Sequence, residues 1–158
     1  MQIGLYANTH GVGYRDDVNN YTRSVPGAML EPVAVAQTAE RNGFHSIWFP
    51  DHVCMPSETN SAHIANQTGA RSYSPRHEML DGAVVMGAVA SATNTIKLGT
   101  SVLVAPYRGP LSDARQFATV DVLSGGRLLL GVGAGWMAEE FDALGVDFAE
   151  RGRRTVEC

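Results

Sequence analysis

The chain has 158 residues, of which 44% are hydrophobic and 18% charged, a composition ordinary for one globular domain with its own core. Its net charge of −4 provides no basic surface for nucleic-acid phosphates, so no nucleic-acid partner is expected. The two cysteines, Cys54 and Cys158, form no CxxC pair, which favours a reducing, cytoplasmic setting. No signal-peptide pattern opens the sequence, and the longest weakly polar stretch (82–96) is too short and too polar to span a bilayer, so no membrane partner is expected.

The apolar pattern predicts strands and helices in strict alternation. The expected strands cover residues 2–7, 44–50, 95–105 and the apolar part of 124–136. The expected helices cover residues 29–41, 79–92 and 110 to the turn at 124–126, with shorter helical segments at 138–144 and from 148 onward. The third helix is expected to face the core with Leu111, Ala114, Phe117, Ala118 and Val120.

This alternation indicates an α/β fold with parallel strands and right-handed crossovers. Two architectures fit the pattern. One is half of an eight-unit barrel, which needs about 250 residues in full. The other is a complete open sheet of four strands, whose last crossover would be a stub.

The loops that follow the first two strands are long, at residues 8–28 and 53–78, whereas every connection from a helix to a strand has only two or three residues. In a parallel sheet, the loops that lead from strands to helices all leave from the carboxyl ends of the strands. A purely structural domain has no reason to lengthen the loops of one edge alone. The sequence therefore predicts a ligand site at that edge.

The stretch 124–136 carries a glycine turn, an apolar run and then Gly131, Gly133 and Gly135. The apolar run predicts a strand buried on both faces, and the glycines would let the backbone approach a flat or anionic ligand closely. The alternative is a plain buried strand with a flexible exit. As a dinucleotide fingerprint the stretch is weak, because its spacing is GxGxG and it follows the fourth strand rather than the first.

Asp51 and His52 follow the second predicted strand directly. A carboxylate beside an imidazole can orient it, and histidine titrates near neutral pH, so the pair could transfer a proton. The alternative is a carboxylate that caps a loop beside a half-exposed histidine. The remaining histidines show no metal-ligand spacing, and no metal is predicted; they are His10, His45, His63 and His77.

Four ordered motifs together resemble the bacterial luciferase-like monooxygenase superfamily, and within it the deazaflavin-dependent oxidoreductases. They are Asp51-His52 after a WFP strand, the run 98–103, the tripeptide 106–108, and 123–127 followed by the glycines of 131–136. Members of this superfamily are (β/α)8 barrels. The resemblance implies that residues 1–158 form the N-terminal part of a single such TIM barrel domain, truncated within the helix after strand four.

The resemblance also implies roles for individual residues in cofactor binding and catalysis. Asp51 would contact the ring system of the cofactor, and His52 would lie near the reactive ring carbon as a catalytic acid or base. Ser101 and Val102 would be joined by a cis peptide that bulges against the back of the ring.

The glycine loop is implied to run along the same ring through Gly133, Ala134 and Gly135. Glu139 and Glu140 lie near a position where some members have a functional acid, and they remain weak candidates. In the family the phosphate of the cofactor is held largely by loops of the second half of the barrel.

The function implied is an oxidoreductase that transfers hydride between coenzyme F420 and a small organic substrate. One alternative is an FMN-dependent monooxygenase of the same fold, which uses O2. An alternative of another class is a non-catalytic half-barrel that self-associates, since a half-barrel leaves two open sheet edges. A homo-oligomer is expected.

Overall fold

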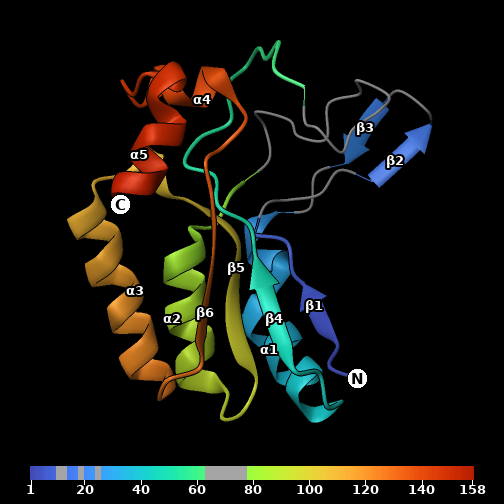
Figure 1. Cartoon of the computed structure of the whole chain (residues 1–158). Helices are drawn as coiled ribbons and strands as arrows, with labels where there is room; N and C mark the ends of the chain where they lie inside the picture. Colours follow the sequence, from blue (N-terminus) through green and yellow to red (C-terminus); the bar gives the residue numbers. More distant parts are fainter. Residues whose placement is uncertain (10–13, 18–19, 24–25, 63–77) are drawn as a thin grey trace.

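The computed structural model describes residues 1–9, 14–17, 20–23, 26–62 and 78–158. Its main feature is one parallel sheet of four strands in the order β1-β4-β5-β6 (Figure 1). These strands are β1 (Gly4–Tyr6), β4 (Ser46–Phe49), β5 (Lys97–Val104) and β6 (Leu128–Gly133). The parallel arrangement predicted from the alternating pattern is confirmed.

Three long helices pack against this sheet and beside one another: α1 (Pro32–Arg41), α2 (Gly82–Ala92) and α3 (Pro110–Ser124). The core lies between them and the sheet, where Ile47, Phe49 and Leu98 are fully buried. Helix α3 buries Phe117 and Val120 as predicted, whereas Leu111, Ala114 and Ala118 are exposed, contrary to the prediction. The shorter segments are η1 (Gly27–Leu30), η2 (Ala105–Tyr107), α4 (Ala138–Ala143), η3 (Phe148–Glu150) and α5 (Arg151–Glu157).

The stretch 8–28 differs most from the prediction of a plain loop. It contains an antiparallel hairpin of β2 (Tyr14–Asp17) and β3 (Asn20–Arg23). These short polar strands lack the alternation of apolar and polar residues from which a strand is predicted. Helix α1 begins at Pro32, later than predicted, because the 3-10 segment η1 precedes it and Glu31 between them has a left-handed φ of 43°.

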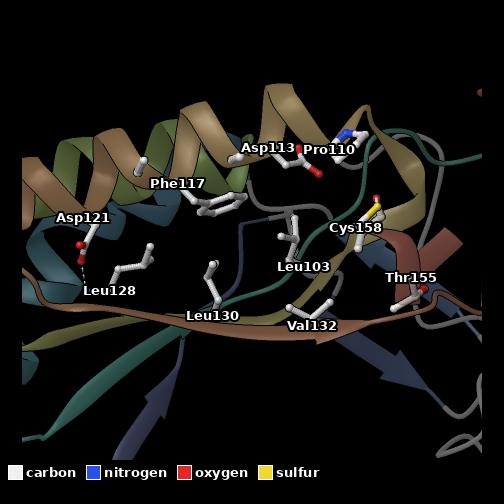
Figure 2. A pocket seen from close by; sticks show the side chains of 13 residues that line it. Leu103, Pro110, Asp113, Phe117, Asp121, Leu128, Leu130, Val132, Thr155 and Cys158 are labelled. Atoms are coloured by element: carbon white, nitrogen blue, oxygen red, sulfur yellow. Dashed lines mark hydrogen bonds between the residues drawn. The ribbon is translucent and has the colours of Figure 1, made fainter.

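Strand β6 is the outermost strand on one side of the four-stranded sheet. It is not buried on both faces, which corrects the prediction of a fully buried strand for this stretch. Leu130 and Val132 are 50% and 51% exposed. Their side chains line a largely apolar groove of about 690 Å³ between β6 and α3, together with Phe117 on the helix and Cys158 near one end (Figure 2). An apolar run bounded by glycines cannot distinguish a central strand from an edge strand, because both have the same local pattern.

The guanidinium of Arg127 joins the ends of two helices to the sheet. Its Nε donates to the carbonyl of Ser124 at 2.6 Å, at the end of α3. Its Nη1 donates to the Thr93 hydroxyl at 2.9 Å and to the Ile96 carbonyl at 2.8 Å, and its Nη2 donates to the Ala90 carbonyl at 2.8 Å. Carbonyls at the end of a helix lack partners within it, so Arg127 satisfies groups that burial would otherwise leave unpaired.

Among the described segments, none of the helices combines the length and the apolar character needed to cross a membrane.

Candidate functional site

The predicted site residues gather where β4, β5 and β6 end. Asp51 follows β4, and its Oδ2 accepts a hydrogen bond of 2.9 Å from the backbone N–H of Val104, at the end of β5. Val102 of β5 lies against Gly133 of β6, where an added Cβ would stand 2.6 Å from its Cγ2. The structure therefore brings the residues predicted from three separate motifs to one edge of the sheet.

The Asp51 carboxylate is held on both oxygens by the guanidinium of Arg108. Nη1 donates to Oδ2 at 2.9 Å and Nη2 donates to Oδ1 at 2.6 Å. Hydrogen bonding to Asp51 raises the pKa of Arg108 further, although burial opposes this. The ion pair ties the loop after β4 to the segment before α3. The contact between Asp51 and a cofactor ring, which the resemblance implies, stays a prediction.

His52 pairs with a carboxylate distant in the sequence rather than with its neighbour Asp51. Its Nδ1 lies 2.9 Å from Oε2 of Glu140, and the two side chains are 8% and 0% exposed. The Asp51 carboxylate is bound instead by Arg108 and by the N–H of Val104. Glu140, a weak candidate from the sequence, is the carboxylate that meets His52.

Glu140 accepts three further hydrogen bonds inside the protein. Its Oε2 accepts a hydrogen bond of 2.7 Å from the hydroxyl of Tyr107. Its Oε1 accepts hydrogen bonds from the backbone N–H groups of Val53 at 2.6 Å and Cys54 at 3.1 Å. Burial alone would favour the neutral acid, but the hydrogen bonds and the charge of His52 outweigh burial and lower the pKa of Glu140. Burial of the Tyr107 hydroxyl and of the Cys54 thiol, together with the nearby charge of Glu140, raises the pKa of both groups.

The glycine loop packs closely on the neighbouring strand and on α4. Gly135 has a φ of 81°, and a Cβ there would lie 2.7 Å from Cγ1 of Val104 and 2.8 Å from Cε2 of Phe141. Within the described residues, Gly133 and Gly135 allow close approach of side chains of this chain, and the approach of a flat ligand stays a prediction. Ala134 lies between Gly133 and Gly135 in the sequence. The rings of Trp136 and His52 meet edge-on, with their centroids 6.5 Å apart.

The peptide bond between Ser101 and Val102 is cis, as the resemblance implies. It lies in β5, where the pairing with β6 is irregular between Thr100 and Leu103. The side chain of Val102 is 40% exposed, so it presents an apolar surface at the sheet edge.

Glu139 anchors the loop that follows β4. Its Oε1 accepts hydrogen bonds from the backbone N–H groups of Asn60 at 2.5 Å and Ser61 at 3.0 Å. Burial disfavours its charge, but these bonds prevail and lower the pKa of Glu139 to about 2. The first part of the long loop 53–78 is thereby fastened to α4, while its residues 63–77 lie outside the described residues.

Comparison with known proteins identifies the family. The sequence profile of the luciferase-like monooxygenases matches residues 17–158. The chain belongs to this family. The resemblance drawn from the four motifs is thereby confirmed, and the family and its solved members are monooxygenases and oxidoreductases.

Individual luciferase-like relatives cover nearly all of this chain. An uncharacterised protein of Mycobacterium tuberculosis is 29% identical over 145 residues, which are 92% of this chain and 48% of the relative. The structure of an F420-dependent secondary alcohol dehydrogenase in complex with an F420-acetone adduct has a TM-score of 0.66 and 26% identity, over 99% of this chain and 39% of that one.

The oxygenating constituent of 3,6-diketocamphane monooxygenase from Pseudomonas putida, solved with FMN, also has a TM-score of 0.66, with 17% identity over 99% of this chain and 37% of that one. This chain thus spans about half the length of the curated relative and a smaller share of both solved structures. The predicted fold class, the N-terminal half of a luciferase-like (β/α)8 barrel, is confirmed.

Two residues with clear structural roles in the site received none from the sequence. Tyr107 and Arg108 belong to a motif that carries the resemblance, but nothing in their spacing indicates which carboxylates they bind. The available signal was the presence of two acids, Asp51 and Glu140, after the predicted strands at this edge. A buried acid requires hydrogen-bond donors around it.

Proposed function

We propose that this luciferase-like chain takes part in hydride transfer between coenzyme F420 and a small organic substrate, with His52 as proton donor or acceptor. The observation that carries the proposal is the contact of His52 with the buried carboxylate of Glu140 at the carboxyl edge of the sheet. An imidazole held by a carboxylate at a strand end is suited to general acid–base catalysis near neutral pH.

The residues at this edge fit one face of a flat ring. Val102 offers an exposed apolar side chain, and Gly133 beside it presents backbone with no side chain of its own. Ala134 and Gly135 continue this surface, and His52 contributes a polar group. We therefore assign ring binding to Ser101, Val102, Gly133, Ala134 and Gly135, with Asp51 as a further candidate.

The phosphate end of the cofactor needs basic or backbone N–H donors. The guanidinium of Arg108 lies at this edge, but it already donates two hydrogen bonds to the Asp51 carboxylate. We propose that the phosphate is held outside the residues described, in the part of the relatives that this chain does not span.

The cofactor, when bound, supplies the site that accepts or donates hydride. In the direction of oxidation, hydride would leave a carbon of the substrate, and the proton of the substrate hydroxyl would pass to Nε2 of His52. In the direction of reduction, His52 would return that proton to the oxygen. Tyr107 and the backbone donors around Glu140 would keep the imidazole in place during either transfer.

The F420-dependent secondary alcohol dehydrogenase, which is 26% identical to this chain, supports the choice of this cofactor. The test is to add F420 and FMN separately to a protein that also carries the part of the relatives that this chain does not span, and to follow binding by fluorescence. Binding of F420, followed by its reduction with a small secondary alcohol, supports the proposal. Tight binding of FMN without a response to F420 would overturn it in favour of a monooxygenase that uses O2.

Replacement of His52 by Ala tests the catalytic role separately. We expect a loss of turnover of roughly 100-fold with the affinity for F420 kept within a few-fold, because general acid–base catalysis contributes about 10²–10⁴. Unchanged turnover would remove His52 from the mechanism.

A further inference from the structure

We infer that Glu140 is the positioning residue of His52: its buried carboxylate fixes the orientation of the imidazole and keeps the proton of the neutral ring on Nδ1. This inference deepens the proposed function and, for its effect on turnover, rests on it. It begins from the distance of 2.9 Å between Nδ1 and Oε2, which joins the residue after β4 to helix α4 across 88 positions of sequence.

The hydrogen bonds of Glu140 indicate that it is ionised. Two backbone N–H groups, of Val53 and Cys54, point at Oε1, and a backbone N–H can only donate. Oε2 then faces the hydroxyl of Tyr107 and Nδ1 of His52, both of which can donate. An ionised carboxylate is an acceptor only, so Nδ1 must carry the hydrogen of the shared bond.

The tautomer follows from that hydrogen bond. With its proton on Nδ1, a neutral imidazole has its lone pair on Nε2. If the carboxylate were absent, the ring could adopt either tautomer. Fixing the proton on Nδ1 therefore keeps Nε2 as the basic nitrogen, which is the atom that the proposed function uses.

The rigidity of Glu140 makes it suitable for this task. Its side chain is fully buried, and four donors surround its two oxygens. Helix α4 holds it close to the glycine loop, where Phe141, the next residue, packs against Tyr107 with ring centroids 4.8 Å apart. A carboxylate bound this way cannot rotate without breaking several hydrogen bonds, so it transmits a fixed orientation to the imidazole.

The neighbouring carboxylate supplies a matched control. Glu139 precedes Glu140 on α4 and is also ionised, but its hydrogen bonds go to the backbone of Asn60 and Ser61. Replacement of Glu139 by Gln removes a charge from the same helix without touching the bond to His52.

The experiment measures the ring ¹⁵N chemical shifts of His52 at a pH where the ring is neutral. In the wild-type protein we expect the pattern of the Nδ1–H tautomer. In Glu140→Gln we expect a mixture of tautomers with a major share of Nε2–H, and in Glu139→Gln the wild-type pattern. A merely structural role of Glu140 would not change the tautomer.

Two results would overturn the inference. One is a wild-type spectrum dominated by the Nε2–H tautomer, which needs no variant and holds even if Glu140→Gln fails to fold. The other is an unchanged Nδ1–H pattern in a folded Glu140→Gln protein, with folding checked by far-ultraviolet circular dichroism.

Measurement of turnover with F420 separates this inference from the proposed function. If F420 is the cofactor, we expect Glu140→Gln to lower kcat roughly 10- to 100-fold, with KM changed much less, because the base is misoriented rather than removed. If the protein does not respond to F420, the proposed function fails, and the tautomer measurement still decides the role of Glu140. A kcat unchanged in an F420-dependent Glu140→Gln enzyme would count against the inference.

Discussion

Asp51 and Arg108 form a two-pronged ion pair that links the end of β4 to the segment before α3, with Nη2 of the guanidinium 2.6 Å from Oδ1 of the carboxylate. The pair is largely buried, and the N–H of Val104 donates a third hydrogen bond to the same carboxylate. Because the segments that leave β4 and β5 meet at this carboxylate, it holds together the edge where the site residues gather.

The Arg108→Met variant should be less stable than the wild type by about 3 kcal/mol. Removal of the guanidinium leaves a buried carboxylate with one backbone donor, and an uncompensated buried charge is costly. The measurement is the free energy of unfolding in urea. Arg153→Gln is the matched control, because the ion pairs of Arg153 with Glu150 and Glu157 lie on the surface. We expect its unfolding midpoint to be unchanged. Equal effects of the two variants would contradict the assigned role of Arg108.

Glu40 should make folding stability depend on pH in the acid range. Its Oε1 accepts hydrogen bonds from the backbone N–H groups of Asn94, Thr95 and Ile96, before β5. Burial opposes the charge, but these bonds outweigh it and lower the pKa of Glu40 to about 2, from 4.5.

A carboxylate whose pKa is depressed by folding stabilises the protein above its unfolded pKa, and this contribution is lost as the pH falls through the folded value. We therefore expect the unfolding midpoint of the wild type to fall between pH 4.5 and 2 more than that of Glu40→Gln. Glu139 and Glu140 are unchanged in both proteins, so their contributions cancel in the difference. Parallel curves for the two proteins would refute the role of Glu40.

Two glycines should respond to the same substitution in opposite directions. A Cβ on Gly99 of β5 would collide with the indole of Trp48 on β4, whereas a Cβ on Gly87 of α2 would meet nothing within 4 Å. We expect Gly99→Ala to destabilise the protein by about 2 kcal/mol through overpacking. Gly87→Ala should stabilise it by about 0.5–1 kcal/mol, because alanine loses less backbone entropy in a helix. Urea unfolding measures both, and a stabilised Gly99→Ala protein would show that Trp48 can move aside.

The groove between α3 and β6 leads us to expect that the 158-residue chain associates with itself in solution (Figure 2). Leu130 and Val132 leave apolar surface open to solvent there, and covering such surface is favourable. Sedimentation velocity over a range of concentrations measures the association. Leu130→Lys should weaken it at least about tenfold, since burial of one leucine contributes about 1.5–3 kcal/mol.

Leu111→Lys is the control for the groove, because Leu111 is an exposed leucine of α3 that does not line it. We expect association of this variant to match the wild type. A monomeric wild-type chain at every concentration would remove both the groove interaction and the predicted homo-oligomer.

Local patterns in the sequence were sufficient to predict a parallel α/β sheet and the edge where the candidate site residues gather. Alternating strands and helices indicated a parallel sheet, because periodicity in a short window reflects which side of an element is buried. The long loops indicated the carboxyl edge, where the structure gathers Asp51, His52, Val102 and Gly133. The same local patterns missed the hairpin of β2 and β3 and the exposure of β6, since these depend on what lies beside each strand.

Only the tertiary structure decided which side chains meet. His52 could pair with its neighbour Asp51 as far as the sequence indicates, yet its partner is Glu140, 88 residues away, while Asp51 binds Arg108 across 57 positions. Contacts of this kind depend on strand register and on the path of α4 over the sheet edge, and neither is encoded in a short window of residues. The sequence by itself determined the α/β class of the fold and the edge at which the candidate site residues gather. The pairing of its charged groups came from packing, because a buried carboxylate is stable only where the folded chain surrounds it with donors.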